Sequence, residues 1–340
     1  MLIRLLFLVA TSCTVFGCST AQTAAPVEDD GGKYSTSFPG PGRTSSLDPA
    51  LLSVRMISSV GFYRQADFSS ATGWPADRPI TDRIWKDADT VTTFTESVVG
   101  TGTVLQFSRS RLALLTSAHV VTFDDTVTTY YRDERGETGV RSFAVKVKQR
   151  NYVADIPGTG DLEVLARDDG LDIAIVGQSI NTRDLIVPVF PLRPGKARDL
   201  DWGSFVYVIG FPAGLRMVTS GIVSQPNRDR DASFLTDVLF NRGMSGGAIL
   251  AARSGSSMLE WVGIATSGSA MTEHMLTPDE EHLHEGLTSG EPYEGEVFIS
   301  KTQRIRYGVT MAVSIEAVRK LAADNRATLL RRGYRLEVLE

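Results

Sequence analysis

Three features of the sequence predict an all-β fold. Short apolar runs rich in Val, Ile, Thr and aromatic residues recur along the chain, and Gly, Asp or Asn bounds them, as is typical of strands separated by turns. Helical periodicity is credible in only two places. The chain shows no repeat of fixed period and no uniformly apolar span after its first residues. With 340 residues, 42% of them hydrophobic, it can bury the core of one large or two small domains.

The expected strands follow one another through most of the chain. In order they are "SVVGTGTVLQF", "RLALLTSAHVV", "SFAVKVKQR", "LDIAIV", "GSFVYVIGF", "RMVTSGIVS" and "MLEWVGIAT". One helical stretch, "SIEAVRKLAADNRATLL", lies near the end of the chain. The other, "DPALLSVRMISSV", has Asp48 as a possible cap and Pro49 as a possible first residue, but its pattern also fits a strand.

The amino terminus has the pattern of an export signal that is too short to span a membrane. "MLIRLLFLVATSCTVFGC" places an Arg before a short apolar stretch and small residues before a cysteine. Its last four residues, "VFGC", resemble the lipobox of bacterial lipoproteins. This resemblance implies a signal peptide over residues 1–17, cleavage before Cys18 and lipidation of Cys18, which would anchor the protein to a membrane of the bacterial cell envelope. The alternative is secretion after cleavage elsewhere.

The residues after the signal predict a tether followed by a folded domain. Residues 18–46 are rich in Ala, Thr, Ser, Pro and Gly, a composition that favours disorder, and we expect the folded domain over residues 47–340. Cys13 and Cys18 are the two cysteines of the chain, so the domain has neither a thiol nor a disulfide. A net charge of −5 without a run of Lys or Arg argues against nucleic acid as a partner.

Ser245 is the first candidate for chemistry, in the glycine-rich stretch "LFNRGMSGGAIL". "GMSGG" fits the G-x-S-x-G pattern, which also describes the nucleophile elbow of α/β-hydrolases. However, His119 directly follows an apolar run in "LLTSAHVV", and Asp172 stands at the start of "LDIAIV". The chain order His, Asp, Ser differs from the order in α/β-hydrolases, and the alternating helices of that fold are not predicted.

Six segments together resemble the trypsin-like serine peptidases, and especially their bacterial HtrA/DegP-type branch. They are "TSAHVV", "DIAIV", "VYVIGFPAG", "VTSGIVS", "TDVLFNRGMSGGAIL" and "WVGIATSGS", within about Val98 to Leu321. The resemblance implies two packed antiparallel six-stranded β-barrels of the chymotrypsin type, over about residues 90–180 and 185–312, with a C-terminal helix and a cleft between the barrels. The residues after that helix are too few for a PDZ domain.

The same resemblance implies a role for each candidate residue. Ser245 would be the nucleophile, His119 its general base, and Asp172 the carboxylate that orients the imidazole. The backbone N–H groups of Gly243 and Ser245 would form the oxyanion hole. The resemblance also implies Thr266 as a hydrogen-bond donor to Asp172, and Val238, Leu239 and Gly268 as pocket residues without a carboxylate.

The polar insertion between Met271 and Glu296 contains His282 and His284 beside Glu residues. Their spacing fits no catalytic zinc motif, so we expect a mobile surface loop, no metal and no cofactor. Three functions remain open. The chain is a membrane-tethered serine endopeptidase acting on proteins or peptides, a catalytically silent peptidase-like binding module, or an esterase that uses the same three residues. The oligomeric state is not predicted by the sequence.

The lipobox resemblance makes a direct prediction about Cys18. Cys18→Ser should convert a detergent-extracted membrane protein into a soluble or unprocessed one, because lipidation needs the thiol. Ser19 after the cysteine favours the outer membrane in a Gram-negative host. Fractionation of cells that express each form measures this, and unchanged membrane association of the variant would argue for another anchor.

Overall fold

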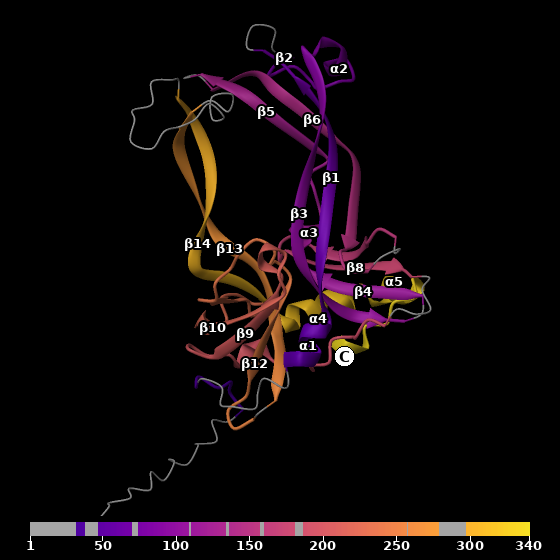
Figure 1. The fold of residues 1–340 in the computed structure, drawn as a ribbon, viewed down its shortest axis with the longest axis vertical. Helices are drawn as coiled ribbons and strands as arrows, with labels where there is room; N and C mark the ends of the chain where they lie inside the picture. Colours follow the sequence, from indigo (N-terminus) through magenta and orange to yellow (C-terminus); the bar gives the residue numbers. More distant parts are fainter. Residues whose placement is uncertain are drawn as a thin grey trace, which may run out of the picture.

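Most of the described chain forms strands, and these strands build two sheets (Figure 1). The all-β class predicted from the sequence is confirmed. The protein is represented by a computed structural model, which describes residues 32–37, 47–69, 74–108, 110–133, 136–156, 160–180, 186–256, 258–278 and 297–340. Among these residues, no helix has both the length and the apolar composition needed to cross a membrane.

The first half of the molecule is an eight-stranded sheet with the order β2-β6-β1-β3-β4-β8-β7, in which β5 pairs with β6. A closed six-stranded barrel was expected here, and the strand lengths explain the difference. β1, β3 and β6 have 14 to 18 residues, whereas β4, β7 and β8 have 6 or 7, so the long strands extend past the neighbours that would close a barrel. We call this extension, which includes β3 before Gly100 and the part of β1 after Ile57 that pairs with it, the N-terminal arm (Figure 1). The strands are β1 (Val54–Asp67), β2 (Trp74–Pro75), β3 (Thr90–Phe107), β4 (Arg111–Thr116), β5 (Thr126–Asp133), β6 (Gly136–Val153), β7 (Glu163–Asp168) and β8 (Ile173–Ser179).

The second half is a closed antiparallel barrel of six strands, as predicted, in the order β10-β11-β14-β13-β12-β9. Its interior is lined by alternate apolar residues of neighbouring strands, among them Val208, Phe234, Ile249 and Val262. The strands are β9 (Phe205–Gly210), β10 (Met217–Gln225), β11 (Phe234–Thr236), β12 (Gly247–Ala252), β13 (Leu259–Pro278) and β14 (Val297–Ser314).

The polar insertion is a long hairpin where the structure describes it. β13 continues through Pro278, and β14 begins at Val297 and pairs with it from that residue onward, so the expected loop over Met271 to Glu296 is wrong for its first residues. His282 and His284 lie outside the described residues. The β13–β14 hairpin and the N-terminal arm extend from the same end of the molecule (Figure 1).

The helices are short, and most lie at strand ends. The ambiguous stretch after Asp48 divides into a helix, α1, and the strand β1, which begins at Val54. The C-terminal helical stretch is two helices that meet at Asn325, and the Ser314 hydroxyl caps the first by accepting a hydrogen bond from Ala317 N at 3.1 Å. The helices are α1 (Leu47–Leu52), α2 (Ile84–Asp87), α3 (Ala118–Val121), α4 (Ile315–Asp324) and α5 (Arg326–Arg331), with short 3-10 turns at Ala197–Asp199, Pro212–Gly214 and Glu337–Leu339.

One apolar cluster joins the two halves. Leu115 and Ile175 of the N-terminal sheet belong to the same buried cluster as Leu250 and Trp261 of the barrel. Phe190, in the connection between the halves, packs against Trp261 with ring centroids 4.7 Å apart. The seam between the halves is therefore a packed core, which fixes their relative position.

Residues 32–37 contradict part of the predicted tether. Tyr34 is 1% exposed, and its backbone forms an antiparallel β-bridge with Arg253. Its hydroxyl donates to Glu260 Oε2 at 2.7 Å and accepts from Lys196 N at 2.9 Å. Ser35 N donates to Ala252 O at 2.8 Å. Burial raises the pKa of the Tyr34 hydroxyl above its ordinary value, so this hydroxyl remains a donor to the Glu260 carboxylate at neutral pH. The other tether residues lie outside the described ranges.

Tyr34→Phe should lower the free energy of unfolding by about 1–3 kcal/mol, because it removes one donor from the buried Glu260 carboxylate and the acceptor of Lys196 N. Urea unfolding followed by fluorescence measures the change. Lys33→Ala is the matched control in the same segment, since Lys33 pairs with Asp201 at an exposed site, where solvent screens the charges, and its loss should cost much less than that of the Tyr34 hydroxyl. Equal effects of the two substitutions would contradict a structural role for Tyr34.

Candidate active site

Three residues predicted from the sequence meet at the seam between the two halves. His119 lies in α3, at the foot of the N-terminal arm, Asp172 immediately precedes β8, and Ser245 lies two residues before β12. His119 Nδ1 is 2.7 Å from Asp172 Oδ2, and His119 Nε2 is 2.8 Å from Ser245 Oγ. The imidazole therefore bridges the carboxylate and the hydroxyl.

Asp172 determines how the imidazole can act. An ionised carboxylate only accepts hydrogen bonds, so the hydrogen of a neutral His119 ring belongs on Nδ1 and Nε2 is left as the acceptor for the Ser245 hydroxyl. Asp172 also fixes the backbone of α3, because its Oδ1 accepts from His119 N at 2.9 Å and its carbonyl accepts from Ala118 N at 3.2 Å. Its φ of 56° is in the left-handed region, which Asp tolerates better than most residues.

In the loop before β12, every backbone carbonyl from residue 241 to residue 245 accepts a hydrogen bond. Such complete pairing leaves the peptide planes little freedom to rotate. The bonds run from Met244 N to Asn241 O at 3.0 Å, Ala213 N to Arg242 O at 3.0 Å, Thr101 Oγ1 to Gly243 O at 2.7 Å, Gly247 N to Met244 O at 2.8 Å, and Thr101 N to Ser245 O at 2.7 Å.

Two buried residues of the same loop have backbone amides that lack a partner among the described residues. Within the part of the chain that the structure describes, neither Gly243 N nor Ser245 N donates a hydrogen bond. Buried amides without a partner are uncommon in folded proteins and call for an explanation. Because both belong to the residues around the Ser245 hydroxyl, together they can donate to an oxygen atom held beside it.

Glycine is required at two positions of this loop. Gly243 has a φ of +102° and Gly246 a φ of +87°, both in the region that side chains rarely adopt. A Cβ at residue 243 would clash with Phe211 O, and one at residue 246 would clash with Thr101 O. The glycines therefore allow the loop to turn tightly while Gly243 lies against Phe211, after β9, and Gly246 lies against β3 of the N-terminal sheet.

Comparison with known proteins relates part of the chain to one family. Residues 100–264 match the family described as "Trypsin-like peptidase domain". Residues 100–264 therefore belong to a trypsin-like peptidase domain. No curated protein matches it significantly. Among solved structures, it is similar to a crystal structure of Deg5, with 16% sequence identity and a TM-score of 0.34 over 66% of this chain and 82% of that one.

Thr101 of β3 is a site residue of the peptidase domain that the sequence analysis missed. Its side chain is fully buried, and its hydroxyl donates to Gly243 O at 2.7 Å and accepts from Phe211 N at 3.0 Å. Its backbone N–H holds Ser245 O, and its carbonyl accepts from the Thr116 hydroxyl at 2.8 Å. The sequence feature that could have identified Thr101 is its position between two glycines in "GTGT", one strand before the strand that leads to His119.

The other predicted site residues do not all lie where the sequence led us to expect them. The hydroxyl of the buried Thr266 is 3.5 Å from Met311 O, and among the hydrogen bonds of the described residues none joins it to Asp172, in contrast to the expected support. Val238 is buried, and its carbonyl accepts from Thr310 Oγ1 at 2.7 Å, while Gly268 stands opposite Thr310 in the sheet. The side chain of Leu239 is largely exposed, so it does not join this group.

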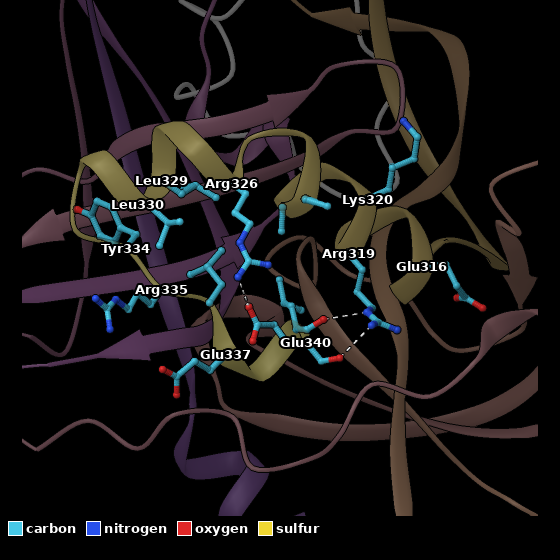
Figure 2. Close-up of a pocket in the computed structure, with 14 residues that line it drawn as sticks. Glu316, Arg319, Lys320, Arg326, Leu329, Leu330, Tyr334, Arg335, Glu337 and Glu340 are labelled. Atoms are coloured by element: carbon cyan, nitrogen blue, oxygen red, sulfur yellow. Dashed lines mark hydrogen bonds and ion pairs between the residues drawn. The ribbon is translucent and has the colours of Figure 1, made fainter.

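A separate cavity of about 870 Å³ lies between α4, α5 and the last residues (Figure 2). Arg319 there donates to Leu339 O at 2.8 Å and Glu340 O at 2.9 Å, and Arg326 pairs with the Glu340 side chain at 3.1 Å. The cavity is lined by none of His119, Asp172 and Ser245. Among the described residues no group of three or more His, Cys, Asp or Glu side chains could hold a metal ion.

Thr101→Val should destabilise the peptidase domain by about 1–3 kcal/mol for each polar group that it leaves buried and unpaired, which are Gly243 O and Phe211 N. Urea unfolding measures the loss. Amide hydrogen exchange should also become faster at Met244 and Gly247, whose bonds close the loop. Thr101→Ser keeps the hydroxyl and serves as the control, and equal exchange in both variants would contradict the role of this hydroxyl.

Proposed function

We propose that the chain is a membrane-tethered serine endopeptidase in which Ser245, His119 and Asp172 perform the reaction. The observation that supports this most strongly is the combination of two features around one hydroxyl. His119 lies within hydrogen-bond distance of both Ser245 Oγ and the Asp172 carboxylate, and the backbone amides of the buried residues Gly243 and Ser245 have no partner among the described residues. A trypsin-like peptidase domain implies protein or peptide substrates.

The proposed reaction has two stages, acylation of Ser245 and hydrolysis of the acyl-enzyme, and His119 acts in both. Ser245 Oγ attacks the carbonyl carbon of the peptide bond while His119 Nε2 accepts its proton, and the negative oxygen formed accepts hydrogen bonds from Gly243 N and Ser245 N. Asp172 stabilises the imidazolium. His119 then donates the proton to the leaving nitrogen, the C–N bond breaks, and an acyl-enzyme remains. Water attacks the acyl group with His119 again as base, which releases the acid and restores Ser245.

Two alternatives use the same residues. A catalytically silent binding module would not need the hydroxyl, the imidazole and the carboxylate in hydrogen-bond contact, so the geometry favours an enzyme over this alternative. An esterase would need the same geometry. Hydrolysis of a peptide amide compared with that of the matching ester separates an esterase from a peptidase.

Membrane tethering through Cys18 is part of the proposal. If Cys18 is lipidated, the anchored chain reaches the folded domain at Tyr34 rather than at residue 47, because Tyr34 is packed against the barrel. The 15 residues from Ser19 to Lys33 could then span at most about 50 Å. This length would keep the peptidase domain close to the membrane surface, at the outer membrane or the periplasmic face in a Gram-negative cell.

Ser245→Ala and His119→Ala should each lower the rate of peptide hydrolysis by about a millionfold, the loss typical of residues that act as a unit. For the same reason the double variant should be little worse than either single one. Fluorophosphonate labelling should occur in the unmodified protein and disappear in Ser245→Ala. Unfolding by urea provides the control for folding, and multiplicative losses would remove Ser245 or His119 from the mechanism.

We also propose cleavage after small or medium apolar residues. Val238 and Gly268, the two predicted pocket residues that remain after the exposed Leu239 is set aside, carry no carboxylate, and a pocket without a buried charge cannot compensate the desolvation of a Lys or Arg side chain. Asp237, the adjacent carboxylate in the sequence, already accepts a hydrogen bond from Ile222 N at 2.6 Å. Digestion of a peptide library with mass-spectrometric readout measures the preference, and predominant cleavage after Lys or Arg would contradict it.

A further inference from the structure

One edge of β3 has no partner strand along the N-terminal arm. β3 pairs with β1 without interruption from Thr90 to Thr103, but it pairs with β4 only from Thr103 onward. Within the described residues, the other edge of the stretch before Gly100 therefore has no strand beside it. In Figure 1 this stretch rises from the level of α3, which carries His119, toward the far end of the arm.

The register shows which backbone groups face away from β1. Thr101 N donates across to Ser245 O, so the N–H of Thr101 points away from β1. Backbone direction alternates along a strand, and the β1–β3 ladder contains no bulge. The N–H and C=O groups of every second residue before Thr101 therefore point the same way. These residues, which we call the β3 edge, are Val91, Thr93, Thr95, Ser97 and Val99.

The β3 edge lacks the usual protection against pairing. Edge strands are commonly blocked by Lys, Pro or a bulge, and the sequence "TVTTFTESV" from Thr90 to Val98 contains neither Lys nor Pro. Every residue of the β3 edge is exposed, and within the described residues no side-chain hydrogen bond engages it. Threonine and valine are also the residue types that favour extended pairing.

We propose that the β3 edge binds an extended segment of the polypeptide substrate by strand addition. This rests on the proposed peptidase function. The position of the β3 edge indicates that its occupant is the substrate. The row of outward backbone groups ends at Thr101, whose N–H is bonded to the carbonyl of Ser245, so the edge leads directly to the proposed nucleophile. From Val91 to Thr101 the edge is about 33 Å long, so it would hold about ten residues of substrate. Recognition through backbone groups is tolerant of sequence and selects unfolded or extended chains over folded ones.

The test measures binding to the full chain carrying Ser245→Ala, so that turnover is not needed. The probe is a fluorescein-labelled peptide of about ten alternating Thr and Lys residues, the length that covers the β3 edge. Thr93→Pro with Thr95→Pro removes two outward N–H groups but none directed at β1, and edge strands tolerate Pro. This pair should weaken binding at least about tenfold, because it removes two backbone hydrogen bonds to the peptide. Thr93→Ala with Thr95→Ala keeps both N–H groups and should bind within about twofold of the parent.

A second probe keeps the test valid if the proline variant does not fold. The same peptide N-methylated at alternate residues retains its side chains but loses its donors, and it should bind the parent at least about tenfold more weakly. Equal binding of the two peptides, or equal loss in the alanine and proline variants, would overturn the proposal. So would an oligomer that dissociates on proline substitution without a change in peptide binding, since the occupant would then be a second copy. Absent fluorophosphonate labelling of Ser245 with intact peptide binding would instead refute only the proposed function.

Discussion

The arrangement of the site depends on the contacts of one buried residue, Thr101. Its N–H, its carbonyl and both hydrogen-bonding capacities of its hydroxyl are engaged, and these four bonds reach Ser245, Thr116, Gly243 and Phe211. The N-terminal sheet and the loop of the barrel are thus held together by directional bonds as well as by apolar packing. A buried hydroxyl between two backbone groups is stable only when both are aligned, so a shift of either half would leave polar groups unpaired.

These bonds explain how the loop around Ser245 can be ordered without proteolytic cleavage of the chain. Each carbonyl from residue 241 to residue 245 is held by a group of the folded domain, and Met244, the residue before the serine, is 2% exposed. Met244 cannot pair with a charged terminal ammonium, and burying one beside it would leave that charge uncompensated. The conformation of Gly243 and Ser245 therefore depends on Thr101 and Ala213 rather than on insertion of a newly formed chain end.

The sequence predicted the parts of the molecule that have a local pattern. His119, Asp172 and Ser245 each stand beside an apolar strand, and the barrel strands alternate or run apolar as buried strands do. Tyr34 has no such context, because its partner Glu260 is 226 positions away and its neighbours are polar. The arm was missed for a related reason. Both faces of β3 before Gly100 are exposed, so the apolar alternation that indicates a strand is absent there.

The arm has a small core of its own, which explains how strands so far from the main core remain paired. Trp74, Ile84 and Phe143 belong to a buried cluster, and Phe94 stacks on Tyr63 with ring centroids 5.0 Å apart. Isolated hairpins are only marginally stable, so this cluster is needed to keep the long strands straight. The family match begins at residue 100, where β3 leaves the arm and enters the peptidase domain. A displacement of the arm along β3 would therefore act on Thr101 directly, and through its hydroxyl on the peptide plane of Gly243.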